Sequence, residues 1–174
     1  MTGLSWLSAH GGAGTTTLRR CIGFGTEISS LRAADPGAVV VVVARTNAEG
    51  LRRAQQIAAV HAARSDCELL AGLVLVADTP SPKLPKPLED LARLVSGGYT
   101  DVWRVPWIEA CRLGEPPDLA RAPKVVRALR EQLVFVCAER AALLQPKALG
   151  AGATDLRHVA AVSKNPYELN GVTS

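Results

Sequence analysis

The chain has 174 residues, of which 48% are hydrophobic and 21% are charged, and its formal net charge is +4. This length fits a single domain, and the apolar share is large enough for a hydrophobic core, so the composition excludes a wholly disordered protein. The positive charges are interspersed with 16 acidic residues, which falls short of the basic surface of a dedicated nucleic-acid-binding domain but leaves nucleic acid open as a partner.

Apolar runs alternate with amphipathic stretches along most of the chain. The apolar runs predict strands at residues 4–9, 38–44, 70–77 and 101–105. The stretches with helical periodicity predict helices at residues 15–31, 48–64, 88–95 and 124–144. Strands and helices that alternate with short connections form βαβ units, so we expect an α/β fold with a mostly parallel sheet flanked by helices.

Local signals refine this outline. Five consecutive valines at positions 39–43 are typical of a central strand that is covered on both faces. Thr46 and Glu49 fit a capping box, with Thr46 as the N-cap of the helix that follows. We expect residues 1–144 to form one α/β domain and residues 145–174, which show little periodicity, to form a flexible C-terminal tail.

The cysteines and the N-terminus indicate the compartment. The four cysteines contain no CxxC pair, so we predict reduced thiols rather than a zinc site or a disulfide framework, at Cys21, Cys67, Cys111 and Cys137. The N-terminus has no signal-peptide pattern, and no apolar run approaches the roughly 20 residues of a membrane-spanning helix. We therefore expect a cytoplasmic protein without membrane insertion.

The segment that most directly indicates function is the glycine-rich stretch at residues 8–18, between a predicted strand and a predicted helix. Glycines let the backbone turn around an anion, and a helix N-terminus offers N–H groups and a partial positive charge. A hydroxyl at the start of the helix can bind Mg²⁺, and here that residue is Thr16. The residues predicted to hold a phosphate are Gly11, Gly12, Ala13, Gly14, Thr15, Thr16 and Thr17. A glycine turn that only packs tightly is the alternative.

This loop resembles the deviant Walker A motif of the ParA/MinD ATPases, Lys-Gly-Gly-x-Gly-Lys-[Ser/Thr]-[Thr/Ser]. The alignment puts His10 at the first lysine, Thr15 at the second lysine and Thr16 at the magnesium-binding hydroxyl. The resemblance implies a P-loop NTPase-like fold, ATP or ADP with Mg²⁺ as cofactor, and a homodimer or a protein partner. Because both lysines are replaced, it also implies a member in which ATP hydrolysis is impaired.

Further segments extend the resemblance over residues 4–135, in the order of the family. They are the valine strand with its helix (39–59), the strand at 70–76, Val105-Pro106-Trp107 and the stretch at 113–116. The family has two more strands, with catalytic and Walker B aspartates, between its first helix and the valine strand. Only residues 30–37 fill that space here, so we expect a reduced number of strands.

Two features leave the mechanism open. In another alignment, residues 74–78 form the Walker B strand and Asp78 lies near Mg²⁺. Trp103, Arg104 and Trp107 could form an exposed aromatic and basic patch for a partner, although a tryptophan that fills the edge of a core is the more common outcome.

Three functions follow from these observations. The first is a catalytically impaired ParA/MinD-like protein that binds a partner, and a nucleotide or phosphate, in plasmid or chromosome partition or in mobile-element transfer. The second is a slow Mg²⁺-dependent ATPase that uses Thr16 and Asp78. The third is a protein-interaction module that binds no nucleotide.

Overall fold

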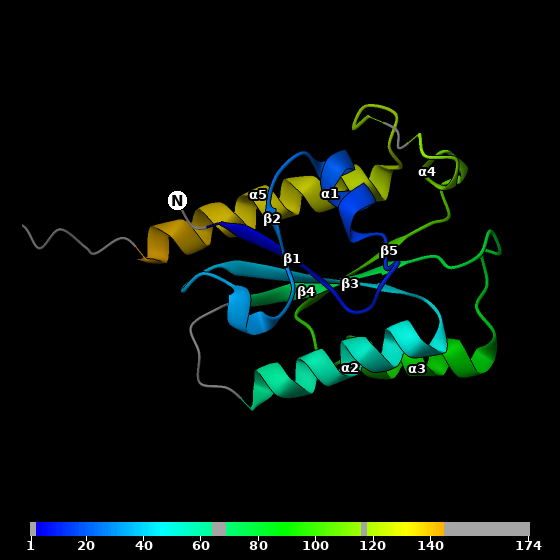
Figure 1. Cartoon of the computed structure of the whole chain (residues 1–174), viewed down its shortest axis with the longest axis horizontal. Coiled ribbons are helices and arrows are strands. Elements are labelled where there is room, and N and C mark those ends of the chain that lie inside the picture. The colour runs from blue at the N-terminus through cyan, green and yellow to red at the C-terminus, as the bar shows by residue number, and fades with distance from the viewer. Residues whose placement is uncertain (1–2, 64–68, 116–117, 145–174) are drawn as a thin grey trace, which may run out of the picture.

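The part of the chain that the structure describes forms a parallel sheet of five strands with helices on both faces (Figure 1). The computed structural model describes residues 3–63, 69–115 and 118–144. The strands are β1 (Leu4–Ser8), β2 (Thr26–Ile28), β3 (Val39–Arg45), β4 (Leu69–Val76) and β5 (Asp101–Val105). The helices are α1 (Thr15–Ile22), α2 (Ala48–Ala62), α3 (Lys86–Ser96), α4 (Glu109–Arg112) and α5 (Lys124–Leu144), with a 3₁₀ turn at Leu31–Ala33. The predicted α/β fold is confirmed, and its arrangement is consistent with that of P-loop NTPases.

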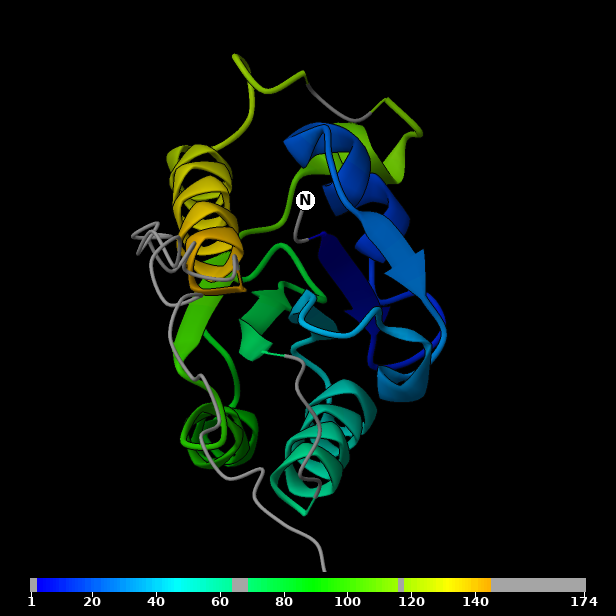
Figure 2. The same ribbon diagram turned by 90° about the vertical axis from the view of Figure 1, so that its left-hand side faces the viewer.

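The strand order, β2-β1-β3-β4-β5, decides where a ligand can bind. The chain leaves β1 toward β2 on one side, and β3 lies on the other side of β1. Figures 1 and 2 show α1 and α5 on one face of the sheet and α2 and α3 on the opposite face. The connections after β1 and after β3 therefore run to opposite faces. In open parallel sheets this switch point leaves a crevice at the carboxyl ends of the two strands, which is where ligands bind.

The valines of β3 form the centre of the core. Residues 39–44 have no exposed surface, because both faces of the strand are covered by helices. Val39, Val41 and Val43 pack with the buried side chains of α1 and α5. Val40 and Val42 pack with those of α2 and α3. The predicted central strand is therefore confirmed. Its run of valines is explained by the helices that cover both of its faces.

The predicted helix at 15–31 is wrong in its second half. Helix α1 ends at Ile22, because Gly23 adopts the left-handed conformation (φ 89°) and its N–H bonds to the Arg19 carbonyl. Gly25 is also left-handed, with φ 96°. The chain then forms β2, a short strand paired with β1. This strand was not predicted; it lies before residues 30–37, the segment that is too short for two strands.

The start of α2 differs from the predicted capping box. Asn47 is the N-cap, and its side-chain oxygen accepts a hydrogen bond from the Gly50 N–H at 2.8 Å. The Thr46 hydroxyl instead accepts a hydrogen bond from the Asp78 N–H at 3.1 Å. Thr46 thus ties the carboxyl end of β3 to the segment after β4.

Some predictions concern parts of the chain that the structure does not describe. The C-terminal tail at 145–174 and Cys67 lie outside the described residues, so the predicted boundary at 144 stays a prediction. Cys21, Cys111 and Cys137 are thiols that form no disulfide. Within residues 3–63, 69–115 and 118–144, no helix combines the length and the apolar character needed to cross a bilayer.

Candidate functional site

A cavity of about 490 Å³ lies at the carboxyl edge of the sheet, at the switch point between β1 and β3. Its lining comes from the segments that follow β1, β3, β4 and β5, and from the first turns of α1 and α5. One part of the wall is apolar, and the polar part includes Arg45, Asp78 and Arg112. A cavity of this volume, with a wall that is polar in one part and apolar in another, lies within the range of small-molecule sites.

The glycine loop forms one side of this cavity. Gly12 and Gly14 have φ of 77° and 93°, in the left-handed region that favours glycine. Gly14 is the N-cap of α1, and no side chain caps this helix start. The positive end of the helix therefore faces the cavity without a side-chain acceptor.

The structure separates the predicted phosphate-binding residues into two groups. Gly11, Gly12, Gly14 and Thr17 line the cavity. Ala13 is buried, and Thr15 is also buried with its hydroxyl oxygen 2.5 Å from that of Ser8. Thr15, which the alignment with the ParA/MinD motif puts at the second lysine, is thus a side chain turned into the protein.

Thr16 does not have the orientation expected of a magnesium ligand. Its hydroxyl donates to a carboxylate oxygen of Glu27 on β2 at 2.9 Å, and the residue does not line the cavity. Arg19 pairs with the other carboxylate oxygen of Glu27, also at 2.9 Å. These two donors, Arg19 first, lower the pKa of Glu27. Thr16 therefore connects α1 to β2, and Thr17 is the hydroxyl residue at the cavity.

Arg45, the last residue of β3, was not found by the sequence analysis. Its guanidinium Nε donates to the Gly12 carbonyl at 3.2 Å, and its Nη1 donates to the Ala77 carbonyl at 3.0 Å. Its Nη2 lies 4.0 Å from the point that a Cβ on Gly14 would occupy. The guanidinium has five N–H groups, and these carbonyls engage only part of them. A positive side chain thus lies at the glycine loop, which itself contains no lysine.

His10 fixes the loop against β3. Its Nε2 accepts a hydrogen bond from the Arg45 backbone N–H at 3.2 Å, and its Nδ1 lies 2.8 Å from the Gly11 carbonyl. A backbone N–H can only donate, so Nε2 is the acceptor in this contact and Nδ1 is the nitrogen placed to donate to the Gly11 carbonyl. Gly50 makes room for this contact, because a Cβ there would lie 2.8 Å from Nε2 and 2.5 Å from the Arg45 carbonyl oxygen. His10 is therefore a positioning residue that holds the loop against β3.

Asp78 lies at the same cavity as the loop, directly after β4. Its side chain is exposed, and its backbone N–H is held by Thr46. Among the described residues, no group of three or more His, Cys, Asp or Glu side chains is placed to hold a metal ion. With Thr16 turned to Glu27, the protein residues do not fit a Mg²⁺ site built from Thr16 and Asp78.

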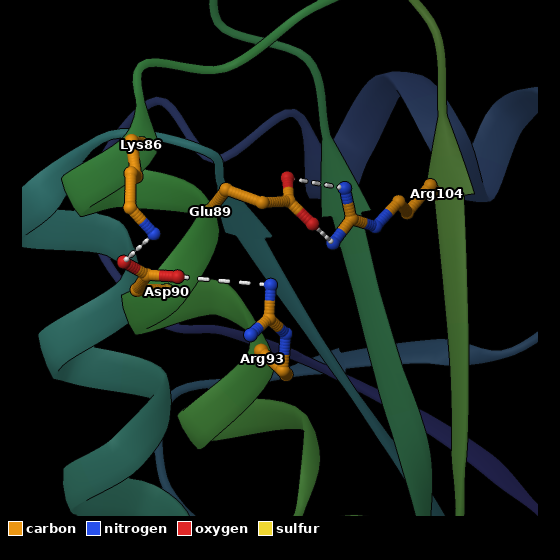
Figure 3. Close-up of polar contacts among 5 residues, drawn as sticks. All are labelled: Lys86, Glu89, Asp90, Arg93 and Arg104. Carbon is orange, nitrogen blue, oxygen red and sulfur yellow. Dashed lines mark hydrogen bonds and ion pairs between the residues drawn. The ribbon is translucent and has the colours of Figure 1, made fainter.

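The predicted aromatic and basic patch is wrong. Trp103 is 9% exposed and donates its indole N–H to Gln132 of α5, so it belongs to the core. Arg104 points to the other face of β5, where its guanidinium makes two hydrogen bonds, of 2.8 and 2.9 Å, to the Glu89 carboxylate of α3 (Figure 3). Trp107 lines the cavity, and the Arg112 guanidinium lies 5.6 Å from its ring centroid. Successive side chains of a strand point to opposite faces of the sheet, so Trp103 and Arg104 lie on different faces of β5.

Comparison with known proteins places the chain in a family but does not name an activity. No curated protein and no solved structure matches it. Residues 3–129 match a family described as a family of unknown function, DUF6668. This match runs from β1 into α5 and includes the loop, Arg45 and the other strand ends around the cavity. The chain therefore belongs to the family of unknown function DUF6668.

Proposed function

We propose that this protein binds a small molecule with a phosphate group, in the cavity at the switch point of its sheet. The observation that carries the proposal is the position of the Arg45 guanidinium, which bonds to the Gly12 carbonyl beside the uncapped start of α1. Two positive groups, a guanidinium and a helix N-terminus, face one cavity. Such an arrangement is stabilised by an anion between them.

In the proposed complex, the loop and Arg45 share the phosphate. The backbone N–H groups at the start of α1 donate to its oxygens, and the guanidinium offers the planar fork that suits phosphate. Thr17 adds a hydroxyl at the cavity wall. The rest of the ligand contacts the apolar residues of the wall, such as Val76, Ile108 and Val126. A nucleotide is the class of ligand that the resemblance to ParA/MinD ATPases implies.

We propose binding without efficient hydrolysis. In P-loop enzymes a lysine and a bound Mg²⁺ neutralise the charge that develops on the transferring phosphoryl group. Here Thr15 replaces the second lysine and is buried, and Thr16 bonds to Glu27. A slow ATPase that uses Thr16 and Asp78 is disfavoured for the same reason. A cytoplasmic role in partition or mobile-element transfer remains a prediction from the resemblance.

Equilibrium binding tests the proposal directly. Purified protein is titrated with ATP, ADP and GTP, each with and without Mg²⁺, and with inorganic pyrophosphate, while heat is recorded. We expect saturable binding of pyrophosphate or of at least one nucleotide, and no measurable release of phosphate over the same period. Absence of binding by every probe at millimolar concentration contradicts the proposal. Release of phosphate that Asp78→Asn abolishes favours the slow ATPase instead.

A further inference from the structure

A second cavity, of about 340 Å³, lies on the face of the sheet that α2 and α3 cover. Its walls come from the end of β1, the residues that follow β2, the 3₁₀ turn and α2, and we call it the α2 groove. No described residue lines both this groove and the cavity at the switch point. Val60 in its wall is 54% exposed, so the groove is open to solvent. An open groove suits an extended segment of a partner better than a small molecule, which is usually enclosed.

The charged side chains of the α2 groove are all positive. Arg32 of the 3₁₀ turn and Arg53 of α2 line it, and the described residues of its lining include no Asp or Glu. Within the described part of the chain, neither guanidinium forms an ion pair, in contrast to those of Arg19 and Arg104. The contact that Arg53 makes is a long hydrogen bond, of 3.5 Å, to Gln56. Two positive groups without a counter-charge at one groove favour a negatively charged ligand.

The uncharged part of the lining has hydroxyl groups at the rim and apolar side chains below them. Ser29 and Ser30 are exposed, and among the described residues neither hydroxyl has a hydrogen-bond partner, so both can donate to an anion. Leu7, which is buried, lies at the base of the groove, with Ile57 and Val60 on the side of α2. An apolar centre within a polar rim is the arrangement of protein–protein interfaces. Nucleic acids, by contrast, are held mainly through their phosphates and sugars.

We propose that the α2 groove binds a segment of a partner protein in which acidic side chains stand next to apolar ones. The guanidinium groups of Arg32 and Arg53 each present a planar fork of N–H groups, which matches a carboxylate. The serine hydroxyls at the rim donate to the same carboxylates, and an apolar side chain of the segment covers Ile57 and Val60. The proposal does not rest on the phosphate-binding function, because the two sites are lined by different residues of the described chain.

A capped tetrapeptide of sequence Leu-Asp-Glu-Leu tests the proposal on the full-length protein. Isotope-labelled protein is titrated with the peptide, and the backbone amide shifts are followed by NMR. We expect saturable shifts that are confined to residues 29–32 and 53–60. The peptide Leu-Asn-Gln-Leu lacks the carboxylates and Ser-Asp-Glu-Ser lacks the apolar side chains, so we expect each to bind about fivefold more weakly, since exposed ion pairs and partly buried side chains each contribute modestly.

Two neighbouring arginines of α2 provide a matched pair of variants. Arg52 and Arg53 are both exposed, but Arg53 lines the groove and Arg52 does not. We expect Arg53→Ala and Arg32→Ala each to weaken binding of the acidic peptide about threefold, and Arg52→Ala to leave it unchanged. Thermal unfolding of the three variants checks that the fold is intact. Pyrophosphate binding is expected to be the same in Arg53→Ala as in the natural sequence, so the proposed function is judged separately.

Several results would overturn the proposal. The first is the absence of shifts with the acidic peptide at millimolar concentration, and the second is an equal response to the acidic and the amide peptide. Shifts centred on Gly12 and Arg45 would place the peptide in the other cavity. An equal loss of affinity in Arg52→Ala and Arg53→Ala would mean general charge attraction. A short single-stranded oligothymidine that shifts residues 29–32 and 53–60 at lower concentration than the peptide would make the groove a nucleic-acid surface instead.

Discussion

At the scale of single residues, ligand binding in the proposed function depends on which side chains face the cavity. The loop pattern predicted that several consecutive threonines would touch a phosphate. In the structure their directions differ, because helix α1 begins at Thr15 and turns each successive residue by about 100°. Thr15 is buried, Thr16 faces β2 and Thr17 lines the cavity. A sequence motif specifies the order of these residues, but the face that each one takes is set by packing against β1 and β2.

The two neighbouring threonines provide a matched pair of variants. Thr17→Val keeps the branched shape but removes the hydroxyl from the cavity wall, so we expect phosphate or nucleotide binding about five- to tenfold weaker, which corresponds to the loss of one hydrogen bond of about 1 kcal/mol. Thr16→Val removes only the bond to Glu27, so we expect unchanged affinity. Titration calorimetry measures both. If Thr16→Val weakens binding and Thr17→Val does not, Thr16 is the residue that contacts the phosphate.

Gly50 tests the contact between His10 and β3. Glycine inside a helix costs about 1 kcal/mol relative to alanine, so a change to alanine normally stabilises a protein. Here a Cβ would lie 2.5 Å from the Arg45 carbonyl oxygen and 2.8 Å from His10 Nε2. We therefore expect Gly50→Ala to lower the free energy of unfolding by about 1–3 kcal/mol, the usual range for overpacking. Urea denaturation measures the change.

The control for this variant is Gly3→Ala, because a Cβ at Gly3 has no atom within 4 Å and the residue has no positive φ. We expect it to be neutral within about 0.5 kcal/mol. If Gly50→Ala is as stable as the control, the close packing of His10, Gly50 and Arg45 is not what fixes the loop.

At the scale of elements, the bounds of helices and strands could be predicted from the sequence wherever the hydrophobic pattern was long. The central strand β3, helix α2 and helix α5 were predicted within about two residues, because buried faces impose a period that can be read from the chain. Strand β2 was missed, since it has three residues and its exposed threonine and glutamate carry no such pattern. Helix α4 was missed for the same reason, as none of its four residues is buried.

The attachment of β2 to α1 through Glu27 gives a prediction about pH. Hydrogen bonds from Arg19 and Thr16 lower the pKa of this carboxylate in the folded protein below its unfolded value of about 4.3. The stabilisation is therefore complete above that pH and is lost as the pH falls through the folded pKa. Glu27→Gln removes the charge, so we expect it to be less stable than the natural sequence at neutral pH.

This difference in the free energy of unfolding should shrink as the pH falls below about 4. Urea titrations of the two proteins across that range measure this difference. Glu89→Gln is the comparison variant, because Glu89 is a second exposed carboxylate with an arginine partner and lies away from the cavity. A difference that stays constant from neutral to acidic pH would show that the charge of Glu27 does not hold β2.

At the scale of the whole molecule, the functional site is a product of topology. The loop after β1 and Arg45 at the end of β3 are more than 30 positions apart, and only the strand order puts them side by side. The loop could be predicted because its glycines are close together in the sequence. Arg45 could not, because a single arginine at the end of a strand gains meaning only once that strand is known to lie beside β1. The glycine loop could be predicted from a local motif, whereas Arg45, which lies across the switch point from it, could not.

In the proposed function, Arg45 supplies the cation of an anion-binding cavity. The most direct test is thermal unfolding of the natural sequence, Arg45→Ala and Arg104→Ala, each with and without saturating MgATP or pyrophosphate. A ligand at about 100 times its Kd stabilises the folded state by about 2.7 kcal/mol, which corresponds to several degrees for a domain of this size. Arg104 is the control because it pairs with Glu89, outside the cavity. We predict a shift in the natural sequence and in Arg104→Ala that is lost in Arg45→Ala. Equal shifts in all three proteins, or no shift in any of them, would contradict the claim.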